Sequence, residues 1–461
     1  MKTTLPLCFS RAKRPALSLL AAFCAFALHA QTPAPAATGQ GFLDFGAPPK
    51  DFAPAAKGTT LEMKALQFLP APLEEGRIIL NQRLRYEGVS QTGVNSSKAL
   101  TLRTRLGYET PKWYGLYGVG IFENTWAINS GSYAPYPGFT GGKAVIGDPR
   151  NNQLNELYLG YAGFNSEFKG GRQSINLDNQ RFVGTVDWRQ NDQTYDAVRV
   201  TTQAFKDVWL SYTWNWQVNR VYGDYAPTSA LRRFDANNHL FNLHYTGLPK
   251  IGTFGAYVYY LDLDNATAAR VTSAGTQKLS STTYGLFLDG RYAIDADWAA
   301  IYRLEYANQS DNKADNPASF SQNYYNVTLG GAYQKFEMGG TFESLGGNGT
   351  QAFQTPLATL HKFNGWADQF LTTPATGLRD YFLWQRSPLP LALSLSTELH
   401  YFTAVQTAQT FGREADIALS RKFGENVTAT IKLARYWGNG APNTGIRADV
   451  TKFWLQLEFN L

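Results

Sequence analysis

Apolar and polar residues alternate with a period of two along most of the chain beyond residue 77. In the last stretch, TKFWLQLEFNL, the large apolar side chains share one face, and Gln456, Glu458 and Asn460 share the other. Successive residues of a strand point to opposite faces of a sheet, whereas an amphipathic helix repeats about every 3.6 residues, and no helical period persists here. The pattern therefore predicts strands that each have one apolar and one polar face.

Segments with this pattern predict about 18 strands. Between them, short turns such as AFKD at Ala204 alternate with longer loops rich in Gly, Asn, Ser and Pro. Outer-membrane barrels have this asymmetry of their two rims, and a sandwich has no reason to keep it. The fold class expected is all-β, a transmembrane antiparallel up-and-down β-barrel. The expected strands are 77–88, 99–109, 115–126, 152–161, 168–175, 193–203, 208–220, 238–246, 254–262, 282–292, 298–308, 323–333, 336–344, 379–386, 391–403, 412–421, 427–437 and 450–461.

The N-terminal segment, residues 1–30, has the organisation of a secretory signal peptide. Four basic residues precede an apolar run from Ala16 to Leu28, and Ala30 offers a small residue at a cleavage point. The run is too short to span a bilayer as a helix. Residues 31–76 are rich in Pro and Ala and are expected to form an extended periplasmic segment. The barrel then occupies 77–461, in the bacterial outer membrane.

Charge and chemistry exclude several other classes of protein. The formal net charge of +6 falls to +2 without the signal peptide, so the basic pI does not indicate binding of nucleic acid. Cys8 and Cys24 both leave with the signal peptide, so no thiolate metal site is expected. No histidine forms a Ser/His signature, and Glu398 and His400, on one strand face, are interpreted as lumen lining. We therefore expect no enzymatic activity, no cofactor and no metal.

A barrel of about 18 strands is wide enough to leave a channel, so its inward side chains decide what passes. Four arginines on the first two strands are expected to form a positive wall that attracts anions, with Arg103 near Arg85. The alternative is that these arginines only pair with acids of the wall. By alternation, the inward bases are Arg83, Arg85, Arg103, Arg105, Arg172, Arg199, Arg291, Arg303 and Lys432, and the inward acids are Glu87, Glu109, Glu156, Asp289, Glu305, Glu337, Glu343, Glu398 and Asp416.

One segment, GRQSINLDNQRFVGTVDWRQ at 171–190, follows neither a helical nor a strand period over its full length. Its first residues end an outgoing strand, and the rest forms a loop on the long-loop side. Aromatic rings present flat faces to sugar rings, and arginine offers forked donors to carboxylates. This loop is therefore expected to form a sugar-binding surface.

These motifs, GRQ…D..RFVG…WRQ….YDAVR together with RLRYE…LTLRTRLGYE, resemble the alginate export family of outer-membrane barrels, from about residue 73 to the C-terminus. The resemblance implies passive passage of an anionic polysaccharide or oligosaccharide, such as alginate-like uronates, through an arginine-lined constriction. The residues matching the family pattern are Arg83, Arg85, Arg103, Arg105, Arg172, Gln173, Arg181, Arg189, Asp196 and Arg199. Arg303 and Glu305 are added to the expected solute path as inward lining.

Other partners and functions stay open at this point. Membrane lipid is expected around the barrel, and insertion machinery is expected to read the last strand, although it ends in Leu461 where such signals usually end in Phe. One alternative function is general diffusion of small solutes. Less favoured are an outer-membrane hydrolase and a structural barrel, whose lumen the long loop between Leu345 and Arg379 would plug. The oligomeric state is not indicated.

Overall fold

The computed structural model describes residues 75–264, 270–272, 275–277, 279–312, 319–407, 409–439, 446 and 448–461. The signal peptide expected at 1–30, and all but the last two residues of the expected periplasmic segment 31–76, lie outside the described residues. Within the described part, no helix has the length and apolar character needed to cross a membrane.

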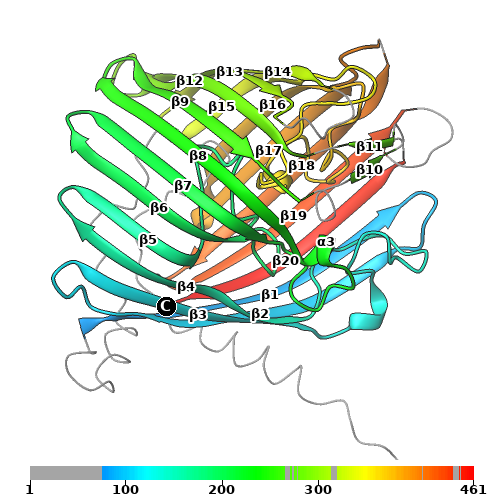
Figure 1. Cartoon of the computed structure of the whole chain (residues 1–461). Coiled ribbons are helices and arrows are strands. Elements are labelled where there is room, and N and C mark those ends of the chain that lie inside the picture. Colours follow the sequence, from blue (N-terminus) through cyan, green and yellow to red (C-terminus); the bar gives the residue numbers. More distant parts are fainter. Residues whose placement is uncertain are drawn as a thin grey trace, which may run out of the picture.

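Eighteen antiparallel strands form one sheet that closes on itself, because β1 pairs with β20 as well as with β2. Figure 1 shows the closed barrel with its strongly tilted strands. The barrel strands are β1 (Arg77–Gln91), β2 (Ser97–Glu109), β3 (Leu116–Ala127), β4 (Asn151–Gly163), β5 (Ser166–Gln173), β6 (Thr194–Phe205), β7 (Val208–Asn219), β8 (Arg233–Leu248), β9 (Gly252–Leu261), β12 (Ser281–Ala293), β13 (Trp298–Ser310), β14 (Ser321–Tyr333), β15 (Phe336–Leu345), β16 (Leu378–Leu389), β17 (Leu393–Thr403), β18 (Thr410–Phe423), β19 (Val427–Gly438) and β20 (Val450–Asn460).

The two rims of the barrel differ, as the sequence predicted. Tight turns join β4 to β5, β6 to β7 and β14 to β15 at the rim where β1 begins and the chain ends. The opposite rim carries the long connections, with the short helix α3 (Ser229–Arg232) and the small hairpin of β10 (Arg270–Thr272) and β11 (Gly275–Gln277). All eighteen expected strands are present, and the fold prediction is confirmed.

Alternation along each strand separates an apolar outer surface from a polar inner surface. On β20, Leu455 is 50% exposed on the outside, whereas its neighbour Trp454 is fully buried inside. The exposed apolar side chains form the outward band that lipid requires in a transmembrane barrel. Buried arginines, acids and amides occupy the inward positions.

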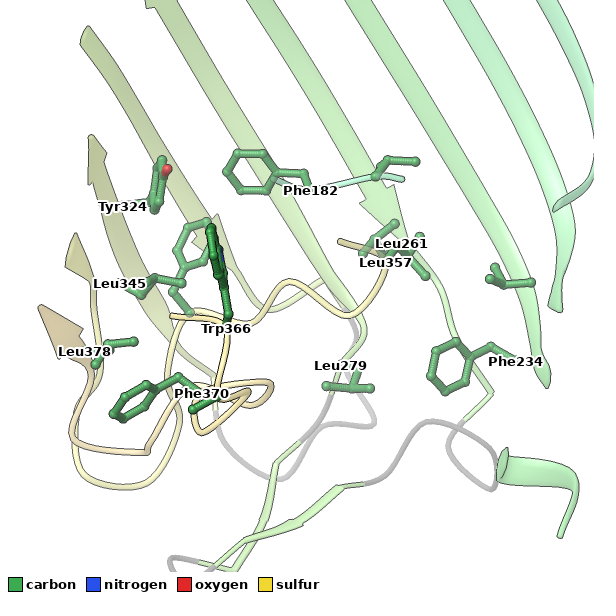
Figure 2. Close-up of a cluster of buried hydrophobic side chains, with 14 of the residues drawn as sticks. Phe182, Phe234, Leu261, Leu279, Tyr324, Leu345, Leu357, Trp366, Phe370 and Leu378 are labelled. Carbon is green, nitrogen blue, oxygen red and sulfur yellow. The ribbon is translucent and has the colours of Figure 1, made fainter. Parts of the chain in front are cut away.

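The apolar core lies inside the barrel, where two long connections fold inward. Loop 174–193 and loop 346–377 both bury apolar side chains against the wall. Phe182 of the first loop packs on Tyr324 and Phe353 with ring centroids 5.4 and 5.9 Å apart. Figure 2 shows Phe182, Leu357 and Trp366 among residues of the wall. The long loop between Leu345 and Arg379, which the sequence analysis considered as a plug, therefore folds into the lumen.

Candidate functional site

Four arginines of β1 and β2 point into the lumen and form what we call the arginine wall: Arg83, Arg85, Arg103 and Arg105. Strand alternation places them inward, and the first three are at most 8% exposed. The strand register sets Arg83 directly opposite Arg103, whereas Arg85 faces Thr101. The expected neighbour of Arg103 is therefore corrected from Arg85 to Arg83.

Every arginine of the wall contacts at least one acid. Arg83 and Arg103 share one carboxylate, that of Glu458 on β20, at 3.0 and 3.3 Å. Arg85 donates to Gln456 Oε1 at 2.6 Å and lies 3.4 Å from Asp148. The fourth member pairs with two acids, Glu123 at 2.6 Å and Asp192 at 2.5 Å. The alternative expectation, that these arginines pair with acids of the wall, is thus observed. The number of acids per arginine differs along the wall, because Arg83 and Arg103 share one acid and Arg105 has two.

Loop 174–193 docks directly on the arginine wall. Arg83 Nη1 donates to the carbonyl oxygen of Asp187 at 2.7 Å and lies near the carbonyls of the next two residues. The indole of Trp188 lies 4.2 Å from the guanidinium carbon of Arg85, a distance that gives cation–π attraction. Gln190 donates to Thr101 Oγ1 at 2.8 Å. The segment predicted to be a sugar-binding loop is therefore held in the lumen by the wall itself.

The two inward loops are joined by a charged and aromatic junction. Arg189 donates to Asp368 of loop 346–377 at 2.9 Å and to Glu87 of β1 at 3.0 Å. Trp188 stacks on the imidazole of His361 with ring centroids 4.8 Å apart and an interplanar angle of 7°. These contacts link both loops to each other and to β1, so neither loop can move without disturbing the other.

His361 lies between an acid and an ammonium group. Its Nδ1 is 2.7 Å from Asp368, and its Nε2 is 2.8 Å from Lys432 Nζ. Burial holds the pKa of His361 well below its usual value, and the charge of Lys432 acts in the same direction against the attraction of Asp368. Burial alone would raise the pKa of Asp368, but His361, Lys452 and Arg189 outweigh it and hold that pKa well below its usual range. His361 is accordingly neutral, with Nδ1–H donating and Nε2 accepting.

Arg181 anchors the other end of loop 174–193. Its Nε donates to Glu343 of β15 at 2.8 Å, and its Nη2 donates to Asn364 at 3.0 Å. The guanidinium also lies 4.7 Å from the ring of Phe363. Burial lowers the pKa of Arg181, but the carboxylate of Glu343 more than compensates, so the pKa is raised. Arg181 therefore holds loop 174–193 against β15 of the barrel wall.

Four further residues of the predicted solute path also face inward. Gln173 Nε2 donates to the carbonyl of Ala197 at 3.1 Å, and Arg199 is 5% exposed. Arg303 contacts Asp289 at 2.6 Å and Glu305 at 2.9 Å. The structure thus places these residues on the inner surface, and their part in solute passage stays a prediction.

Arg172 and Asp196 do not belong to the lumen. The register sets Arg172 opposite Leu157, which is 55% exposed on the outer surface, and opposite Asp196 on the other side. Residues that pair across adjacent strands point to the same face of the sheet. Gln173 points into the lumen, so its neighbour Arg172 points outward. The two charges form an ion pair of 2.7 Å on the outside of the barrel. The prediction that they face the lumen is wrong, because adjacent residues of one strand cannot share a face.

The site also contains residues that the sequence analysis did not select. Glu458 lies on the polar face of the last strand, so the alternation of that strand could have predicted that it points inward. Asp148, Asp192 and Asp368 come from loops, where no period predicts the direction of a side chain. Trp188 lay within the quoted loop motif but was not singled out. Loops therefore supply two of the four acids that pair with the arginine wall, Asp148 and Asp192, and strands supply the other two, Glu123 and Glu458.

A second inward surface, on β16, β17 and β18, has the opposite character, and we call it the carboxylate wall: Asp380, Glu398, Glu414 and Asp416. All four are at most 3% exposed. Their registers bring Glu398 directly opposite Asp416 and His400 directly opposite Glu414. Loop 346–377 docks here through two backbone groups, since Trp366 N donates to Asp416 at 3.1 Å and Ala367 N to Glu414 at 2.6 Å. The side chain of Asn364 also donates to Asp380 at 3.2 Å.

The arginine wall can attract a carboxylate, and two loops restrict the space in front of it. Excess positive charge in a region of low dielectric raises the local concentration of anions. Forked guanidinium groups can also bind a carboxylate with two hydrogen bonds. The arrangement can therefore bind an anionic group inside the lumen.

Comparisons with known proteins agree with this architecture. Residues 146–337 match the model of the alginate export family, a region that is narrower than the extent expected from sequence and does not include the arginine wall. No curated protein matches the chain. Among solved structures, OccK9 (OpdG) of Pseudomonas aeruginosa shares 15% identity with a TM-score of 0.65, over 84% of this chain and 99% of that one.

Two further structures show the same barrel. OccAB2 of Acinetobacter baumannii shares 13% identity with a TM-score of 0.64, over 85% of this chain and 99% of that chain. OpdK of Pseudomonas aeruginosa, solved with vanillate, shares 12% identity with a TM-score of 0.63, over 84% and 99%. Identities this low establish the fold alone. The chain therefore has the fold of an 18-stranded porin barrel, and residues 146–337 match the alginate export family.

Proposed function

We propose that the protein is a channel of the bacterial outer membrane that passes anionic saccharides of the alginate-like uronate type. One observation carries this proposal: Arg83 and Arg103 stand opposite each other and share the single carboxylate of Glu458. Two guanidinium groups against one carboxylate leave an excess positive charge at this part of the wall. A carboxylate of a passing solute can take the place of Glu458 as their partner.

The junction of the two loops supports a saccharide as the carrier of that carboxylate. The indole of Trp188 borders the arginine wall with Arg85 and His361 packed against its ring, and a sugar ring that displaces one of them would meet an aromatic face. The match to the alginate export model includes this loop, within residues 146–337. The expectation that the protein is not an enzyme, and that membrane lipid and insertion machinery are its partners, stays part of the proposal.

Passage of small solutes is the second candidate, and the inward loops favour it. Loops 174–193 and 346–377 bury their apolar residues inside the barrel and reduce the free cross-section. A long polymer needs more room than a small solute or a short oligosaccharide. The two candidates therefore differ in the length of saccharide that can enter.

Block of single channels by saccharides tests the proposal. The mature protein in planar bilayers is exposed to oligouronates and to neutral malto-oligosaccharides of the same length. We expect block by the uronates only, and about tenfold weaker block in Arg103→Gln, because a charge about 6 Å away at an effective dielectric near 40 contributes about 1.4 kcal/mol. Arg103 suits this test because Glu458 keeps Arg83 as a partner.

Arg172→Gln is the matched control, since it removes the same charge from the outer surface. Its block by uronates should equal that of the unmodified protein. Equal block by charged and neutral saccharides, or none by either, would reject the anionic-saccharide proposal and leave small-solute diffusion.

A further inference from the structure

The carboxylate wall contains a group of three buried ligand types that converge on one point. Glu398, His400 and Asp416 each offer one atom, and these atoms lie within 4.8 Å of one another. From this geometry we propose a site for a divalent transition-metal ion such as Zn²⁺, bound by the Nε2 of His400 and the carboxylates of Glu398 and Asp416. The sequence analysis interpreted Glu398 and His400 as ordinary lining, because Asp416 lies on the next strand.

The imidazole of His400 is held in one orientation. Its Nδ1 lies 3.0 Å from both carboxylate oxygens of Asp380. The ring also stacks between Phe382 and Phe402, with centroid distances of 4.7 and 5.3 Å and interplanar angles of 22° and 10°. A carboxylate that accepts from one ring nitrogen fixes the other nitrogen as a metal ligand, as is usual for metal-binding histidines. Asp380 therefore directs Nε2 toward the two remaining acids.

The separations fit a shared cation better than a hydrogen bond. Nε2 of His400 lies 3.4 Å from Glu398 Oε2 and 3.7 Å from Asp416 Oδ2. Both distances exceed the usual range of about 2.7–3.2 Å for N–H···O hydrogen bonds. Two ligands bound to Zn²⁺ at about 2.1 Å with tetrahedral geometry are roughly 3.4 Å apart. The two distances from Nε2 therefore match edges of a tetrahedral coordination shell, and all three ligand atoms lie within 4.8 Å of one another.

Unpaired oxygens in the same cluster point to a ligand. Glu398 and Asp416 are only 2% and 3% exposed. Glu398 Oε1 and Asp416 Oδ1 have no hydrogen-bond partner among the described residues. Glu414, opposite His400 in the register, shares a side-chain hydrogen bond with Asp416 when one of the two carries a proton, and it is available as a fourth ligand. Burying carboxylates without a partner is unfavourable, and a divalent ion would supply the missing charge.

A metal ion here would also fasten loop 346–377. The same two acids, Glu414 and Asp416, accept the backbone N–H groups of Ala367 and Trp366. An ion that orders these carboxylates would order the acceptors on which the loop docks. Loading of the site is therefore expected to raise thermal stability and to reduce fluctuations of the channel current.

Metal binding to the full mature barrel tests the proposal. Protein in detergent is stripped with a chelator and dialysed against Zn²⁺, and the bound metal is measured. We expect one Zn²⁺ per chain, a higher melting temperature, and at least tenfold weaker binding in Glu398→Gln and His400→Gln. The matched control is His244→Gln, which removes another inward histidine paired with a single acid, Asp178 at 2.6 Å, and should bind zinc as the unmodified protein does.

Co²⁺ in place of Zn²⁺ gives a readout that does not depend on the variants. Visible absorption of four-coordinate Co²⁺, and an X-ray absorption spectrum with nitrogen and oxygen ligands at about 2.0–2.2 Å, are expected from the unmodified protein. Absence of stoichiometric Zn²⁺ and of the Co²⁺ spectrum would overturn the proposal and leave His400 as a charged partner of its three acids. Unchanged binding in folded Glu398→Gln and His400→Gln would equally overturn it.

Discussion

The arginine wall and the carboxylate wall lie in neighbouring sectors of one lumen, separated by β19 and β20. Both are built by the same alternation of inward side chains, and both hold an inward loop. They differ in how their charge is balanced. Acids from loops, from β3 and from β20 come to the arginines, whereas loop 346–377 brings only backbone N–H groups to Asp416 and Glu414.

This difference shows that the charge of a lumen cannot be counted from its strands alone. Asp148 and Asp192 neutralise arginines of the first two strands although both acids come from loops. On the carboxylate wall, His400 is the residue that contacts three of the four acids. One wall is therefore nearly balanced, with a small positive excess at Arg83 and Arg103, and on the other four carboxyl groups crowd around one imidazole.

The same substitution on the two walls should have opposite effects, and this is the largest effect we expect. Glu458→Gln removes the carboxylate that Arg83 and Arg103 share, so it should reduce the free energy of unfolding by about 3 kcal/mol. Glu414→Gln removes one of several crowded acids and keeps an acceptor for Ala367, so in chelator-treated protein it should stabilise by about 1 kcal/mol.

Urea unfolding of both variants in detergent measures these changes, with heat-modifiable migration in gels as the check on folding. Destabilisation of similar size in both variants would show that the carboxylate wall is as well balanced as the arginine wall, and the contrast between them would be wrong.

Docking of loop 346–377 on the carboxylate wall should depend on Gly365. This residue has φ of +83°, and an added Cβ would lie 2.4 Å from the Glu414 carboxylate. Gly365→Ala should weaken docking by about 2 kcal/mol and increase both current noise and cleavage of the loop by protease. Gly349→Ala is the control, because Gly349 has φ of +88° but no atom within 4 Å of the added Cβ. Equal effects in the two variants would mean that backbone strain, rather than contact with the wall, decides docking.

The loop junction should respond to pH through His361. The pKa of this imidazole is held below its usual value in the folded protein, so the unfolded chain binds a proton that the folded chain does not. The resulting stability is present above about pH 6.5 and falls by up to about 1.4 kcal/mol per pH unit below it. Melting temperatures of the unmodified protein and of His361→Gln from pH 7.5 to 5 measure this contribution. The slope below pH 6.5 should be smaller in the variant, and parallel curves would contradict a neutral His361.

Arg172→Gln should have the smallest effect. Its ion pair with Asp196 lies on the outer surface at the long-loop rim, where β5 ends and β6 begins, with side chains 25% and 17% exposed. Exposed pairs of this kind contribute about 1 kcal/mol or less. Urea unfolding should show a change within that limit. A loss as large as that of Glu458→Gln would mean that Arg172 belongs to the buried network and that its reassignment to the outer surface is wrong.

Most of the barrel could be predicted from the sequence because strand alternation is a local property. All the strands, the asymmetry of the rims and the inward direction of Arg83, Arg85, Arg103 and Arg105 follow from it. The same rule, applied with the wrong phase, misplaced Arg172.

The network around the arginines could not be predicted in this way. Arg189 meets Glu87 and Asp368 across sequence separations of 102 and 179 residues, and loops have no period that links such partners. Side chains of three different strands form the cluster around His400, and only the register between strands brings them together.

The positive excess of the arginine wall is the central claim, and the reversal potential of single channels in a tenfold salt gradient tests it most directly. We predict anion selectivity for the unmodified protein, a shift of the reversal potential toward cations in Arg103→Gln, and no shift in Arg172→Gln. The shift should shrink at high salt, since the Debye length falls from about 10 Å at 0.1 M to about 3 Å at 1 M. A reversal potential that is the same in the unmodified protein and in Arg103→Gln would contradict the claim, and the paired arginines would then serve only to hold the loops.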